Sequence, residues 1–94
     1  MDILNQYKLS VIIPCFNEEK TIQEIINKVQ KNNIENKELI IVDDFSNDKT
    51  RDILKNLENE NNIKIIYNEK NLGKGFCLRK GFQEAKGEII IIQD

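Results

Sequence analysis

The chain has 94 residues, with 14 Lys and Arg against 16 Asp and Glu, no His and no Trp, which allows one small domain at most. A net charge of −2 provides no basic face for a phosphate backbone, so nucleic acid is not an expected partner. No apolar run is longer than the four residues of 89–92, far short of the ~20 residues of a membrane span. The N-terminus has no features of a secretory signal, and two cysteines are too few for a disulfide framework. We therefore expect a soluble, cytoplasmic protein without a transmembrane segment.

The chain begins with a short leader, residues 1–7, followed by a strand and a helix. Residues 9–13 are apolar and β-branched, which predicts a buried strand that stops at Pro14. Apolar residues then recur at helical spacing and predict an amphipathic helix over 18–31 with Asn17 as its N-cap. The predicted buried stripe is Ile22, Ile25, Ile26 and Val29.

The same alternation continues through the middle of the chain. A second buried strand is predicted over 39–42, and a helix over 48–60 begins at Ser46, Asn47 or Asp48 as cap. The stripe of this helix is Ile53, Leu54 and Leu57. Residues 63–67 form a third strand, and because Lys64 interrupts its apolar run we expect it at the edge of a sheet.

A third helix and a fourth strand complete the pattern. The helix is predicted over 74–86, with Gly81 allowing close packing and Gly87 as its stop, and its apolar stripe is Leu78, Phe82 and Ala85. Residues 89–92 are four consecutive isoleucines and predict a strand. An outermost strand of this kind would be an exposed apolar edge that is prone to aggregation. We therefore expect the sequence to be the first part of a larger domain.

Strands alternating with crossovers of this length indicate an α/β fold with a parallel sheet and helices on both faces. In such sheets ligands bind beyond the carboxyl ends of the strands. Acidic residues follow three of the predicted strands: Glu18, the pair Asp43 and Asp44, and Asp94. Convergent carboxylates suit a divalent cation, or hydrogen bonds to the N–H and hydroxyl donors of a ligand.

Each of these residues also has a structural interpretation. Glu18 and Asp48 could cap helices, while Asp43 and Asp44 could fill a turn. Lys74 stands between two glycines and could supply a charge to a diphosphate, but a solvated lysine at a helix start is as plausible. Cys15 and Cys77 are most simply small, buried, inert thiols.

Five motifs occur in order over residues 8–94. They are Pro14-x-x-Asn17-Glu18, then Ile41-Val42-Asp43-Asp44-x-Ser46-x-Asp48-x-Thr50, then Asn71-x-Gly73-Lys74-Gly75, then Gly81-x-x-x-Ala85-x-Gly87, and last a strand into Asp94. This series resembles family 2 glycosyltransferases with the GT-A fold, and within them the dolichyl- or polyprenyl-phosphate sugar transferases. The resemblance implies a Rossmann-like half domain over 1–94 with strand order 3-2-1-4.

The resemblance also implies a nucleotide-sugar site. Pro14 and Phe16 would wall the nucleobase of a UDP- or GDP-sugar, and Glu18 would reach the nucleoside. Asp44 would accept from the base ring N–H, with Val42 lining the same pocket. Lys74 would contact the diphosphate. Asp94 resembles the first aspartate of a D-x-D motif that holds Mg²⁺ or Mn²⁺.

Three positions depart from the family pattern: Phe16 stands where Tyr is frequent, and Phe45 and Lys49 replace small residues in their turn. The second D-x-D aspartate, the catalytic base and the acceptor site would lie beyond residue 94. We therefore expect the donor-binding part of a metal-dependent transferase, inactive by itself. Its acceptor would be a polyprenyl phosphate, a lipid or a polysaccharide, reached at the cytoplasmic membrane face in a full-length form.

The alternative function is a truncated, non-catalytic remnant that binds nucleotide weakly. A receiver-like phosphoacceptor domain is disfavoured, because the paired aspartates follow the second strand rather than the first.

Overall fold

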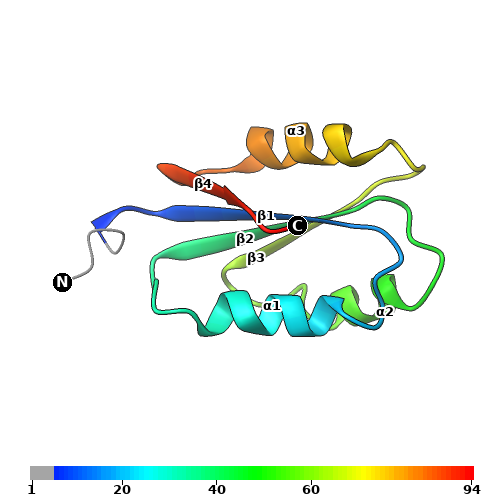
Figure 1. Ribbon diagram of the computed structural model, residues 1–94, viewed down its shortest axis with the longest axis horizontal. Helices are drawn as coiled ribbons and strands as arrows, with labels where there is room; N and C mark the ends of the chain where they lie inside the picture. Colours follow the sequence, from blue (N-terminus) through cyan, green and yellow to red (C-terminus); the bar gives the residue numbers. More distant parts are fainter. Residues whose placement is uncertain (1–5) are drawn as a thin grey trace.

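A computed structural model of the chain describes residues 6–94 as one α/β layer structure, so most of the predicted leader lies outside the described residues. Its elements, in chain order, are β1 (Leu9–Cys15), α1 (Ile22–Lys31), β2 (Lys37–Asp43), α2 (Thr50–Lys55), β3 (Ile63–Tyr67), α3 (Lys74–Glu84) and β4 (Ile89–Ile92). The four strands are parallel and ordered β3-β2-β1-β4, which confirms the predicted order and the edge position of β3. Helices α1 and α2 cover one face of the sheet and α3 covers the other (Figure 1).

The first strand runs two residues further than predicted, through Pro14 to Cys15. Pro14 pairs with Val42 of β2, whereas β4 ends opposite Ile12. A proline lacks the N–H of a ladder hydrogen bond and is tolerated where one side of a strand has no partner. Pro14 lies beyond the end of β4, so the strand continues through it.

Two helices begin later than predicted. Helix α1 starts at Ile22 instead of residue 18, because Asn17 has a left-handed φ of 50° and the chain makes a turn in which Thr21 and Ile22 donate to the Glu18 carbonyl. Asn17 is therefore not the N-cap, which is Thr21. Helix α2 is confined to Thr50–Lys55, and turns continue after it.

Helix α3 buries a different stripe from the one predicted. Cys77 and Gly81 are buried, whereas Phe82 is 43% exposed. A Cβ built on Gly81 would lie 2.5 Å from Cγ2 of Ile12, so the helix packs on the sheet through its glycine and has no room there for a ring. The helix ends at Glu84, and Gly87 is not its stop. A Cβ on Gly87 would lie 2.7 Å from the Ser10 backbone nitrogen, so this glycine allows close approach to β1.

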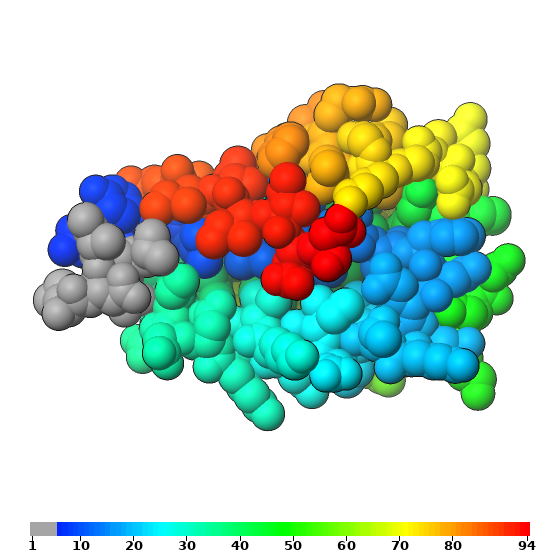
Figure 2. Space-filling view, viewed as in Figure 1, coloured from blue at the N-terminus to red at the C-terminus, as the bar shows by residue number. Residues whose placement is uncertain are grey.

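The core is thickest where β1 and β2 meet α1 and α2, and a smaller cluster of Ile40, Val42 and Cys77 lies beneath α3. β4 contributes little to either cluster. Its residues Ile90, Ile91 and Ile92 are 40–43% exposed. Figure 2 shows this strand, in orange-red, on the molecular surface. No helix in residues 6–94 has the length and apolar character needed to cross a membrane.

Candidate functional site

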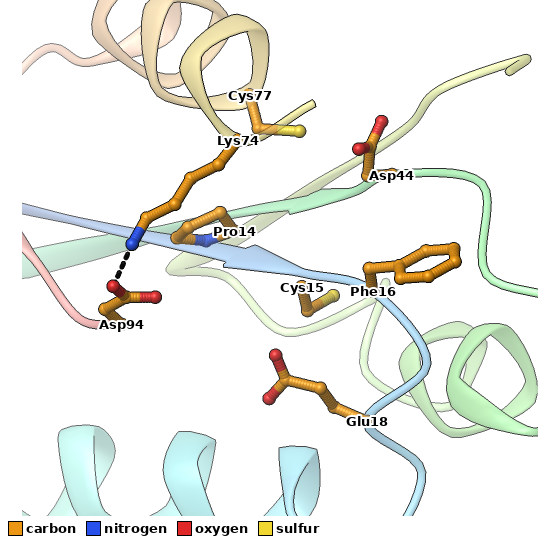
Figure 3. A pocket seen from close by; sticks show the side chains of 8 residues that line it. All are labelled: Pro14, Cys15, Phe16, Glu18, Asp44, Lys74, Cys77 and Asp94. Atoms are coloured by element: carbon orange, nitrogen blue, oxygen red, sulfur yellow. Dashed lines mark hydrogen bonds and ion pairs between the residues drawn. The ribbon is translucent and has the colours of Figure 1, made fainter. Parts of the chain in front are cut away.

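The carboxyl ends of the strands open onto a cleft of about 140 Å³ (Figure 3). Its walls come from the end of β1 and the loop after it, the residue after β2, the first turn of α3 and residue 94. The lining residues are Pro14, Cys15, Phe16, Glu18, Asp44, Lys74, Cys77 and Asp94. Ligand pockets usually measure roughly 300–1,000 Å³. The cleft is therefore smaller than a usual ligand pocket, and it could enclose only one part of a ligand as large as a nucleotide.

Six of the seven residues predicted for the site meet in this cleft. The exception is Val42, which is fully buried and packs with Ile40 and with the lining residue Cys77. Val42 faces the core under α3, because successive side chains of a β-strand lie on opposite faces. The polar side chain that reaches the cleft is Asp44, which follows the end of β2. The functional role of each of the seven residues stays a prediction.

Asp44 is held by the loop that precedes α3. Its Oδ1 accepts hydrogen bonds from the Leu72 amide at 2.8 Å and Asn68 Nδ2 at 3.0 Å, and its Oδ2 accepts one from the Gly73 amide at 2.9 Å. Burial opposes ionisation of Asp44, but these donors outweigh it and the pKa of the carboxyl is lowered. The Cys77 thiol, a weak donor, also contributes a hydrogen bond to this carboxylate. A ligand N–H that approached Asp44 would take the place of this weak donor.

Lys74 and Asp94 form an ion pair across the cleft (Figure 3). Lys74 lies at the first position of α3, and the pair joins this helix to the end of the sheet. Residues 6–94 contain no group of three His, Cys, Asp or Glu side chains placed to hold a metal ion. A single exposed carboxylate fits a cation such as Mg²⁺ only if phosphate oxygens and water supply the other ligands.

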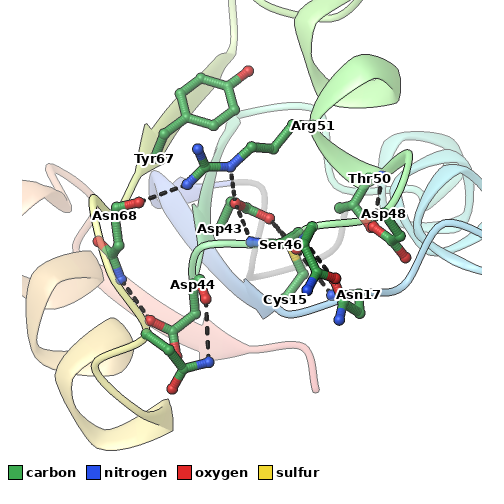
Figure 4. Close-up of polar contacts among 12 residues, drawn as sticks. Cys15, Asn17, Asp43, Asp44, Ser46, Asp48, Thr50, Arg51, Tyr67 and Asn68 are labelled. Atoms are coloured by element: carbon green, nitrogen blue, oxygen red, sulfur yellow. Dashed lines mark hydrogen bonds and ion pairs between the residues drawn. The ribbon is translucent and has the colours of Figure 1, made fainter.

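Asp43 has the structural role that the sequence offered as one of two interpretations, and it does not join the carboxylates of the cleft. It is fully buried, and its carboxylate accepts from Arg51 Nε at 2.6 Å, from the Ser46 amide at 3.1 Å and from Ser46 Oγ at 2.6 Å (Figure 4). Asp43 thus fixes the turn that follows β2 and does not line the cleft. A buried carboxylate requires a cationic partner, and Arg51 is one of only two arginines in the chain.

Hydrogen bonds join the loop after β1 to the loop after β2. Ser46 Oγ accepts from the Asn17 amide at 2.9 Å, Thr50 Oγ1 from the Glu18 amide at 2.9 Å, and Asp48 Oδ2 from the Glu19 amide at 3.2 Å. Asp48 also accepts from the Thr50 amide at 2.8 Å through Oδ1, so it serves both the start of α2 and the neighbouring loop. These bonds fix the backbone that carries Phe16 and Glu18.

Both cysteines are buried free thiols, as predicted. Burial raises the pKa of Cys77 to about 11, and it also raises the pKa of Cys15, with the charge of Asp43 adding to the effect. Because the thiolate is the reactive form, neither side chain is a nucleophile at neutral pH.

Comparison with known proteins identifies the family of the chain. Residues 10–94 match the family model described as glycosyl transferase family 2. The chain belongs to this family. Among curated relatives of this family 2 chain, the cholesterol galactosyltransferase of Borreliella burgdorferi is 36% identical over 99% of the chain. The dolichol-phosphate mannosyltransferase of Pyrococcus furiosus is 33% identical over 93% of the chain.

The solved structures of similar proteins share the GT-A arrangement of the sheet. Staphylococcus aureus TarS in complex with UDP-GlcNAc matches 93% of this family 2 chain with a TM-score of 0.85 and 34% identity. The mannosyltransferase PcManGT of Pyrobaculum calidifontis, in complex with GDP-Man and Mn²⁺, matches 89% with a TM-score of 0.82 and 24% identity. The chain spans 25–26% of the length of the two curated relatives and 26% of each of these structures.

Proposed function

We propose that residues 1–94 form the donor-binding part of a metal-dependent glycosyltransferase that uses a UDP- or GDP-sugar. The cleft carries this proposal, because it gathers an aromatic face, a carboxylate and a lysine at the carboxyl ends of parallel strands. The similar protein TarS forms a complex with UDP-GlcNAc, which supports a nucleotide-sugar donor.

In this proposal Pro14 and the half-exposed ring of Phe16 contact the faces of the nucleobase. Asp44 reads its edge. The lowered pKa keeps Asp44 an acceptor, and a base N–H would replace the weak Cys77 thiol as a donor to this carboxylate. Uracil and guanine both present a ring N–H in this position, whereas cytosine presents a ring nitrogen with a lone pair. The site would therefore accept UDP or GDP and reject CDP.

The diphosphate would lie between Lys74 and Asp94, whose ion pair places a positive and a negative group at the same end of the cleft. Lys74 would contact the phosphate oxygens as a point charge. Asp94 would hold Mg²⁺ or Mn²⁺ jointly with those oxygens, and such an ion offsets the charge that builds on a leaving nucleoside diphosphate.

The acceptor in this proposal is a lipid, a polyprenyl phosphate or a polysaccharide. Cholesterol and dolichol phosphate appear in the names of two relatives, which supports a lipid acceptor. The residues that would bind it are not among those of the cleft, so the chain by itself should bind donor nucleotide and transfer no sugar.

Calorimetric titration of the 94-residue chain with UDP, GDP and CDP, each with and without Mn²⁺, tests this function. We expect UDP or GDP to bind, more tightly with Mn²⁺, and CDP to bind much more weakly. Asp44→Asn should weaken binding about tenfold, the effect of one hydrogen bond to a charged group. The control Asp52→Asn, which removes the same charge from an exposed position on α2, should change nothing. Equal binding of CDP and UDP would contradict the role of Asp44.

A further inference from the structure

Arg51 lies outside the cleft, yet it contacts the end of β2 and the residue that follows β3. It projects from α2, and its side chain is 28% exposed. Its Nε donates to Asp43 at 2.6 Å and its Nη2 donates to the Asn68 carbonyl at 2.6 Å (Figure 4). One planar guanidinium therefore joins the turn after β2 to the residue that follows β3.

Two aromatic rings flank the same guanidinium. Its central carbon lies 5.4 Å from the ring centroid of Phe45 and 5.5 Å from that of Tyr67. Both distances are within the range of a cation–π contact. Phe45 has a left-handed φ of 66°, which is costly for a bulky residue, so the turn is held in this conformation by its contacts.

From Arg51, two chains of hydrogen bonds lead to the cleft. Through Asp43 and Ser46 Oγ the first reaches the amide of Asn17, which stands between Phe16 and Glu18. Through Asn68 the second reaches Asp44, because Asn68 Nδ2 donates to Asp44 Oδ1 at 3.0 Å. Asp44 in turn holds the amides of Leu72 and Gly73 before α3.

We propose that Arg51 is a positioning residue: its planar fork fixes Asp44 and the Phe16–Glu18 loop in the arrangement that receives the nucleobase. The effect on ligand affinity rests on the proposed function, whereas the effect on the loops does not. A lysine keeps the charge beside Asp43 but cannot donate in one plane to both Asp43 and the Asn68 carbonyl. Charge and positioning are thus separable at this residue.

The test compares Arg51→Lys with Arg79→Lys, a matched change at an exposed position of α3. Amide hydrogen exchange of the 94-residue chain should show faster exchange at Ser46, Leu72 and Gly73 in the Arg51 variant, by about tenfold for one lost charged hydrogen bond. Amides of β1 and β2 should change much less. Arg79→Lys should match the wild type. UDP or GDP, whichever binds the wild type, should bind the Arg51 variant about tenfold more weakly.

A second pair of variants applies if Arg51→Lys does not fold. Tyr67→Phe keeps the ring beside Arg51 and loses only the 2.7 Å hydrogen bond to Glu58, whereas Tyr67→Leu removes the ring. Only Tyr67→Leu should accelerate exchange at the loop amides.

Equal acceleration of loop and sheet amides would overturn the proposal, because it would mean that Arg51 contributes only to global stability. Unchanged loop exchange in the Arg51 and Tyr67→Leu variants would also overturn it. If no nucleotide binds the wild type, the proposed function fails, and the exchange pattern still decides whether Arg51 positions the loops.

Discussion

Gly73 and Gly75 flank Lys74, and the backbone makes opposite demands at the two positions. Gly73 has a φ of 91° and a ψ of 161°, a conformation that side chains rarely adopt, although a Cβ there would meet no atom within 4 Å. Gly75 lies in the first turn of α3 with an ordinary φ, and its Cβ would make only a van der Waals contact with Arg79. The motif therefore contains one required glycine and one replaceable glycine.

We expect Gly73→Ala to lower the free energy of unfolding by about 1–3 kcal/mol, the cost of a strained backbone. Gly75→Ala should raise it by about 0.5–1 kcal/mol, because alanine restricts the unfolded chain and favours the helix. Urea unfolding of the two variants measures both changes. Similar effects of the two substitutions would show that the left-handed conformation of Gly73 is not required.

The buried thiols predict how stability depends on pH. Burial raises the pKa of Cys77 from 9.0 to about 11, and the pKa of Cys15 is raised as well. The unfolded chain therefore loses these protons at lower pH than the folded chain. The contribution of the protonated Cys77 thiol to the free energy of unfolding is fully present below pH 9.0, and it is lost as the pH rises through the pKa of Cys77 in the folded chain. Urea unfolding between neutral pH and pH 11 should show a falling free energy, with a shallower fall in Cys77→Ala.

At the scale of elements, the contact between α3 and β1 depends on a single missing side chain. A Cβ on Gly81 would lie 2.5 Å from Cγ2 of Ile12 and 3.1 Å from two further atoms of that side chain. Ile12 is fully buried at the centre of the sheet, so it has little freedom to move. The helix approaches the sheet as closely as the glycine permits.

Gly81→Ala should therefore destabilise the protein by about 1–3 kcal/mol, the usual cost of an overpacked core, despite a gain in helix propensity of roughly 1 kcal/mol. In an Ile12→Ala background the same substitution should cost much less, because the clashing atoms are gone. A double-mutant cycle by chemical denaturation measures this coupling. Additive effects would place the cost of Gly81→Ala elsewhere.

At the scale of the whole molecule, the two edges of the sheet differ. β3 carries Lys64, which forms a 2.8 Å ion pair with Glu84 of α3, and a charged residue on an edge strand opposes pairing with another chain. The edge formed by β4 consists of isoleucines and pairs only with β1 within the described residues. An exposed apolar strand edge invites pairing with another chain.

We expect the 94-residue chain to self-associate through β4. Ile91→Lys should shift sedimentation velocity profiles towards the monomer at a fixed protein concentration, because a charge on an edge strand opposes pairing. Asn56→Lys, which adds the same charge at the exposed C-cap of α2, is the control and should leave the profile unchanged. A concentration-independent monomer for the wild type would contradict this expectation.

The sequence by itself determined the order of elements and the place of the site. Helical spacing in α1 and apolar runs in the strands are local patterns, and each forms the expected element. The resemblance of the motifs supplied the strand order. Because parallel strands end at one edge, Glu18, Asp44 and Asp94 could be expected to meet there, and all three line the cleft.

Only the tertiary structure decided which polar residues face a ligand and which hold the fold. Asp43 and Asp44 are adjacent and chemically identical, but strand alternation buries Asp43 against Arg51 and leaves Asp44 at the cleft. Phe82 fits the apolar period of α3, yet the close approach at Gly81 turns a neighbouring face of the helix to the sheet. Burial and partners of this kind come from contacts between residues that are distant in sequence, and local patterns do not encode them.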